Sequence, residues 1–62
     1  MKRQWLIDYR KKKNLTQEEV AKICELTQQA YSQYENGNKR PKPETAQKLA
    51  KLLDFKWTRF YV

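Results

Sequence analysis

Two helix-start signals that stand close together constrain this chain more than any other feature. The Thr16 hydroxyl can accept a hydrogen bond from the backbone N–H of Glu19, while the Glu19 carboxylate can reach back to the N–H of Thr16, which is a capping box. Thr27 offers a second N-cap soon afterwards. These signals predict helices over about residues 17–24 and 28–36, joined by a tight turn.

Other signals predict helices on both sides of this pair. Asn14 suits the left-handed end of a preceding helix, Gly37 the end of the helix over 28–36, and Pro43 the first turn of the next. Apolar residues recur at helical spacing, and no long apolar–polar alternation indicates a strand. We expect further helices over about 3–13, 43–53 and, in short form, 56–61. The fold class is therefore all-α, a compact bundle of four to five short helices in one domain over 1–62.

Charge and composition narrow the function. The chain has 62 residues and a formal net charge of +7, which indicates a polyanionic partner: nucleic acid or, less favoured, an anionic membrane surface. With no His and a single Cys, we expect no metal, no cofactor and no enzymatic activity. A lone Cys favours the reducing cytoplasm. The first apolar run stops at Asp8, so we expect neither a signal peptide nor a membrane span.

The helix expected over 28–36 has an unusual polar face. At about 100° per residue its uncharged polar side chains fall within one arc of roughly 140°, opposite Ala30, Tyr31 and Tyr34. We call this arc the uncharged face; its members are Gln28, Gln29, Ser32, Gln33 and Asn36. An amide offers one donor and one acceptor, which matches adenine in the major groove of DNA. A solvated or protein-binding face is the alternative, although a solvated face in so charged a chain should carry charges.

Basic residues flank this helix in sequence. Residues 10–13 and the basic loop, residues 38–42, together hold half of the 14 cations. Uncharged side chains beside cations are typical of DNA-binding proteins, in which contacts to bases determine the sequence preference and contacts to phosphates position the protein on the duplex. The loop cations Lys39, Arg40 and Lys42 are accordingly expected at the DNA backbone.

The segments LTQEEVA at 15–21, TQQ at 27–29, YENG at 34–37, KRP at 39–41 and LAKLL at 49–53 carry a resemblance. Residues 17–36 resemble the helix-turn-helix of the Cro/CI-type (XRE) family, especially small lambdoid-phage repressor and Cro domains, and the likeness extends over about 6–61. It implies a sequence-specific, double-stranded-DNA-binding transcriptional regulator, a repressor. We also expect a homodimer on a near-palindromic operator and, in so short a chain, no small-molecule ligand.

The resemblance also implies residue roles. It assigns base reading to Gln28, Gln29, Ser32 and Gln33, DNA-backbone contacts to Gln17 and Asn36, and a structural ion pair to Arg10 and Glu35. Two positions depart from the family pattern. Glu25 stands at a turn position that is often Gly, where a positive φ costs about 1 kcal/mol. Tyr31 replaces the usual Ile or Val, which implies a rearranged core or a hydroxyl that reaches the surface.

The C-terminal segment, residues 55–62, carries four aromatic side chains. So small a core cannot easily bury all four, and a surplus aromatic patch usually marks an interface. We therefore expect Trp57, Phe60 and Tyr61 at a homodimer surface. Two other functions stay open: an antitoxin or controller protein of the same fold whose main partner is a protein bound by this segment, and a membrane-active cationic peptide.

Overall fold

The computed structural model describes residues 1–61, and this part of the chain is all-helical. It contains α1 (Gln4–Lys12), α2 (Gln17–Ile23), α3 (Gln28–Asn36), α4 (Pro43–Leu53) and the 3-10 helix η1 (Trp57–Tyr61). The predicted all-α class is confirmed. Val62, included in the expected domain and in the C-terminal segment, lies outside the described residues.

The predicted caps explain where α2 and α3 begin. The Glu19 N–H donates to Thr16 Oγ1 at 3.1 Å, and the Thr16 N–H donates to Glu19 Oε1 at 2.8 Å, so the capping box is formed. Thr27 Oγ1 accepts from the N–H of Ala30 at 3.0 Å. These bonds satisfy backbone donors that the first turn of a helix leaves free.

Left-handed residues mark the turns between helices. Asn14 has φ 58° and Gly37 has φ 79°, as their positions predict, and Glu25 does adopt a positive φ, at 59°. The left-handed Asp54, φ 66°, which ends α4, has no counterpart in the predictions. At Gly37 a Cβ would also lie 1.8 Å from the carbonyl oxygen of Met1, so the position requires glycine twice over.

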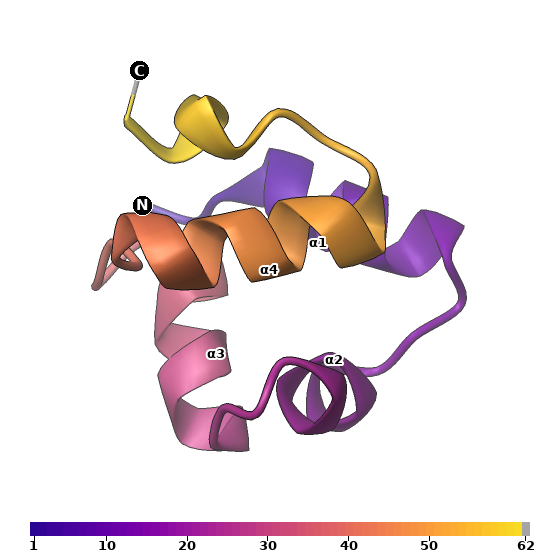
Figure 1. Ribbon diagram of the computed structural model, residues 1–62. Coiled ribbons are helices and arrows are strands. Elements are labelled where there is room, and N and C mark those ends of the chain that lie inside the picture. The colour runs from indigo at the N-terminus through magenta and orange to yellow at the C-terminus, as the bar shows by residue number, and fades with distance from the viewer. Residues whose placement is uncertain (62) are drawn as a thin grey trace.

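The helices pack around one small core (Figure 1). α4 crosses the middle of the molecule, α2 packs against α3 below it, and η1 packs against α4 above it. The described residues span about 25 × 21 × 21 Å. The core consists of Leu6, Val20, Ala21, Cys24, Tyr31, Ala46, Leu49, Leu53 and Phe60.

An aromatic cluster closes the core between α1 and the C-terminal segment. Trp5 packs edge-on against Phe55 and Phe60, with ring centroids 5.1 Å apart in both pairs. The expectation that Phe60 lies at a dimer surface is wrong: only 3% of it is exposed, because this small core needs its ring. Trp57 and Tyr61 are half-buried.

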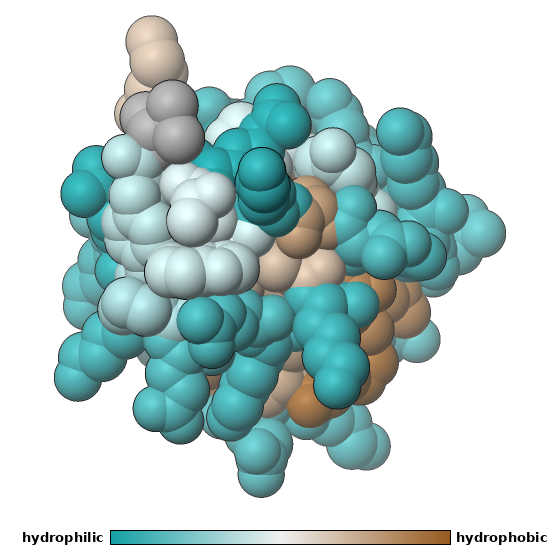
Figure 2. Space-filling view, turned by 45° about the horizontal axis from the view of Figure 1, so that its top comes forward, coloured by the Kyte–Doolittle hydropathy of each residue, from teal (hydrophilic) through white to brown (hydrophobic). Residues whose placement is uncertain are grey.

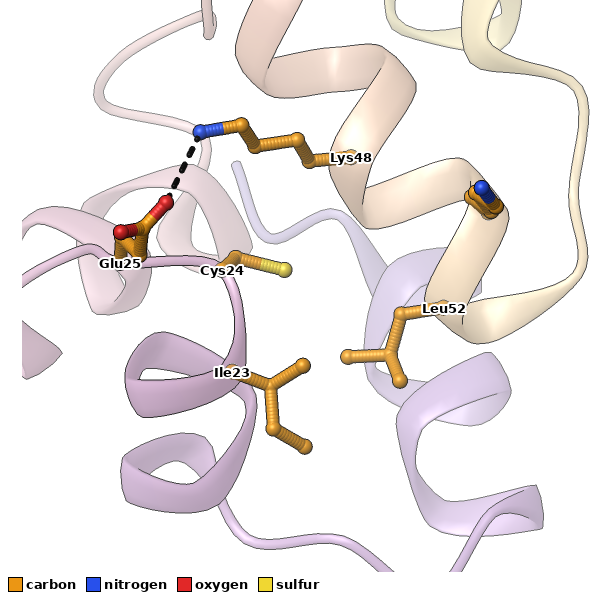
Figure 3. Close-up of a pocket in the computed structure, with 6 residues that line it drawn as sticks. Ile23, Cys24, Glu25, Lys48 and Leu52 are labelled. Atoms are coloured by element: carbon orange, nitrogen blue, oxygen red, sulfur yellow. Dashed lines mark ion pairs between the residues drawn. The ribbon is translucent and has the colours of Figure 1, made fainter.

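Apart from the N-terminal Met1, the large apolar side chain that is exposed among residues 1–61 lies on α2. Ile23 is 56% exposed and, together with Leu52 of α4, lines an open pocket of about 360 Å³. In Figure 3 these two side chains point toward one another, the Cys24 thiol points between them, and Lys48 pairs with Glu25 at one edge. Figure 2 shows a mostly hydrophilic face, with hydrophobic residues, coloured brown, at its lower right and near its centre. Among residues 1–61, no helix is long and apolar enough to cross a membrane.

Candidate nucleic-acid interface

The uncharged face lies on the solvent side of α3. Gln28, Gln29 and Asn36 are exposed, while Ser32 and Gln33 are half-buried. On the opposite side of the helix, Tyr31 is fully buried in the core. Across residues 1–61, none of the five polar side chains has an intramolecular hydrogen-bond partner. Their donors and acceptors are therefore available to an external partner.

A buried carboxylate holds α3 in place from behind. Glu35 is only 1% exposed, and its oxygens accept from three helices. Arg10 Nε of α1 donates to Oε2 at 2.6 Å, Gln17 Nε2 of α2 donates to Oε1 at 2.8 Å, and the Tyr31 hydroxyl donates to Oε2 at 2.5 Å. The Arg10–Glu35 ion pair is thus part of a larger network that ties α1, α2 and α3 together. We call it the Glu35 network.

Electrostatics keep this network in its charged form. Burial alone would raise the pKa of Glu35, but the hydrogen bonds from Arg10, Tyr31 and Gln17 outweigh it and lower the pKa. The hydrogen bond to Glu35 raises the pKa of Arg10. Burial, followed by the bond to Glu35, raises the pKa of Tyr31, which therefore donates as a neutral phenol. The buried carboxylate is therefore ionised and cross-links α1, α2 and α3.

Tyr31 and Gln17 are placed differently in the Glu35 network from what the sequence predicts. The idea that the Tyr31 hydroxyl reaches the surface is wrong, because it is buried and bonded to Glu35. The i, i+4 spacing of these two residues on one helix is a signal that could have found the pair. Gln17, expected at the DNA backbone, directs one amide hydrogen inward to Glu35. It keeps a second amide hydrogen, and its backbone N–H stands in the first turn of α2.

The basic loop runs from the end of α3 toward α4. Lys39, Arg40 and Lys42 are exposed, whereas Pro41 between them is buried. The cations of residues 10–13 lie elsewhere: the end of α1 is at the opposite side of the molecule from the loop (Figure 1). Only one of the two basic runs that flank α3 in sequence therefore lies beside the end of that helix.

Sequence reasoning missed two supports of this loop. Arg3 Nη1 donates to the carbonyl of Lys39 at 2.8 Å, and the Tyr61 hydroxyl donates to the carbonyl of Pro41 at 2.6 Å. Both hydrogen bonds join residues that are far apart in the chain. The sequence around Arg3 and around Tyr61 contains no pattern that indicates these bonds.

A tight turn between two capped helices, the second with a free polar face, defines a helix-turn-helix protein. The sequence matches the helix-turn-helix family over residues 6–60. The chain belongs to this family, in its Cro/CI (XRE) type. It is 39% identical over 61 residues to the uncharacterized HTH-type transcriptional regulator YqaF of Bacillus subtilis strain 168, covering 98% of this chain and 80% of that protein. No solved structure matches it.

Proposed function

We propose that this chain is a sequence-specific transcriptional repressor that binds double-stranded DNA and reads the major groove with α3. The observation that carries the proposal is the uncharged face, whose side chains have no hydrogen-bond partner among residues 1–61 and lie on a helix anchored by the Glu35 network. Repression would follow from occupancy of an operator, in the cytoplasm, without cofactor or small-molecule ligand.

Each part of the interface has a role in this proposal. Gln28, Gln29, Ser32 and Gln33 read base edges, for which carboxamides and hydroxyls suit adenine and its neighbours. The phosphates are contacted by Gln17, Asn36, Lys39, Arg40 and Lys42. The three loop cations are exposed, which supports their assignment to phosphate contacts, because a phosphate can reach only a cation at the surface.

We further propose that the chain binds as a homodimer on a near-palindromic operator. A two-fold axis would place the two copies of α3 one DNA turn apart, roughly 34 Å. The half-buried Trp57 and Tyr61 of η1 are the surface for this contact, without Phe60. The area left on two half-buried rings is small, so the dimer forms on DNA rather than free in solution.

Selection of bound duplexes from a random pool tests the function. We expect an enriched site made of two inverted half-sites whose centres are about one helical turn apart. A pool with no enriched sequence would contradict base reading. If no sequence is enriched and a protein partner co-purifies with the chain in stoichiometric amount, the controller or antitoxin function is favoured instead.

A further inference from the structure

The basic loop is held from both ends of the chain. Arg3, just before α1, donates to the carbonyl of Lys39, and Tyr61, at the end of η1, donates to the carbonyl of Pro41. Two alternate carbonyls of one exposed loop are thus bonded by side chains from opposite termini. Loops are ordinarily the most mobile part of a small domain, and these two bonds restrict the motion of this loop.

Arg3 also joins this loop to α3. Its backbone N–H donates to the carbonyl of Glu35 at 2.7 Å, and its Nη1 donates to the carbonyl of Tyr34 as well as to that of Lys39. The carbonyls in the last turn of a helix have no partner within the helix. Arg3 therefore adds to the bonds that the backbone amides of residues 37–39 make to the end of α3, and it links that end to the loop that follows.

Two guanidinium groups, those of Arg3 and Arg40, lie beside this loop. The Arg40 guanidinium lies 5.6 Å from the centroid of the Tyr61 ring, and that of Arg3 lies 5.4 Å from the centroid of Phe60. Burial and, secondarily, the charge of Arg40 lower the pKa of Arg3. Within residues 1–61 neither guanidinium pairs with a carboxylate. An anion placed against the loop would offset this repulsion.

We propose that Arg3 and Tyr61 are positioning residues, which hold the basic loop in its phosphate-binding conformation before DNA arrives. This inference rests on the proposed function. Pre-ordering the loop removes an entropy cost that binding would otherwise carry, so it raises affinity for any duplex and leaves the preference among sequences unchanged.

Two conservative substitutions distinguish the effect of holding the loop in place from the effect of the positive charge of Arg3. Tyr61→Phe removes one hydroxyl and keeps the ring under Arg40, and Arg3→Lys keeps the charge and loses the forked donor. Tyr9→Phe is the matched control, because Tyr9 contacts the same aromatic cluster and its hydroxyl donates no hydrogen bond among the described residues.

Amide hydrogen exchange of the DNA-free protein gives the first measurement. The N–H groups of Asn38 and Lys39 donate to the carbonyl of Gln33 at 3.0 and 3.3 Å, so they report on the loop. We expect Tyr61→Phe and Arg3→Lys to speed their exchange about fivefold, the loss of roughly one hydrogen bond. The amides of Leu49 and Leu53 should not change, whereas global destabilisation would speed them equally. Unchanged exchange at both loop amides would overturn the inference.

Binding to random and selected duplexes gives the second measurement. We expect both variants to bind both duplexes about fivefold more weakly, with an unchanged ratio between them, and Tyr9→Phe to bind as wild type. If wild type binds duplex DNA and the variants bind equally well, the inference fails and the proposed function stands. If wild type binds no duplex, the proposed function fails. Hydrogen exchange then still tests whether Arg3 and Tyr61 hold the loop.

Discussion

At the scale of single residues, a buried charge is what fixes the geometry of the interface. Glu35 is almost fully buried, yet no side-chain polar atom buried within residues 1–61 lacks a partner. The Tyr31 hydroxyl supplies one of the bonds that a Val or Ile at this position could not. Removing one partner from such a site is costly, since the remaining group stays desolvated.

Tyr31→Phe tests this network through its pH dependence. The pKa of Glu35 is lowered in the folded state, so its contribution to stability is present above the unfolded pKa of about 4.3 and is lost as the pH falls through the folded value. Loss of the Tyr31 donor raises that folded pKa. We expect the free energy of unfolding to fall by about 1 kcal/mol at pH 7 and the gap to wild type to narrow below about pH 4.

Urea denaturation from pH 3 to pH 7 measures both effects. Tyr34→Phe is the control, because the Tyr34 hydroxyl makes no hydrogen bond within the described part of the chain. A gap that stays constant over this range would show that the Tyr31 hydroxyl does not act through the ionised Glu35 carboxylate.

At the scale of elements, local signals predict where helices begin and end, whereas long-range contacts escape them. The capping box, Thr27, Gly37 and Pro43 place three helices to within a residue of their observed bounds, because each signal acts over a few neighbouring residues. Arg3 and Tyr61 were missed as loop supports because their partners lie 36 and 20 positions away. Phe60 was misplaced because the pattern does not show which aromatic side chains close the core.

Glu25→Gly tests the turn between α2 and α3. Glu25 has φ 59°, a conformation that a side chain makes unfavourable and that glycine tolerates. The side chain lost is 82% exposed, and its ion pair with Lys48 contributes little. We expect thermal or urea denaturation to show a stabilisation of about 0.5–1 kcal/mol. Glu18→Gly, inside α2, should instead destabilise by a similar amount; a destabilising Glu25→Gly would mean that this turn is not strained.

At the scale of the whole molecule, the proposed function gives the excess of positive charge a general attraction to DNA and gives the basic loop the phosphate contacts that position the protein. In the proposed complex Arg40 and Lys42 each neutralise a phosphate, because they are exposed next to the end of α3. The cations of residues 11–13 lie at the far side of the molecule from this loop, where Lys13 pairs with Asp54, so the proposed complex assigns them no phosphate contact.

Arg40→Ala and Lys42→Ala measure this contribution. We expect each to weaken binding to selected and random duplexes alike, and to reduce the slope of log affinity against log salt by about one. Fluorescence anisotropy across a salt series gives the slopes. Lys51→Ala, an exposed cation on α4 away from the loop, should change the slope less. Equal slopes for all three variants would remove the loop from the interface.

The uncharged face of α3 is the central element of the account, and substituting its first two glutamines tests it most directly. Once a site has been selected, Gln28→Ala and Gln29→Ala are compared with wild type on that site and on random duplex by the same anisotropy titration. We predict a loss of about 1–3 kcal/mol on the selected site and nearly unchanged binding to random DNA. Equal losses on both duplexes would contradict base reading by α3.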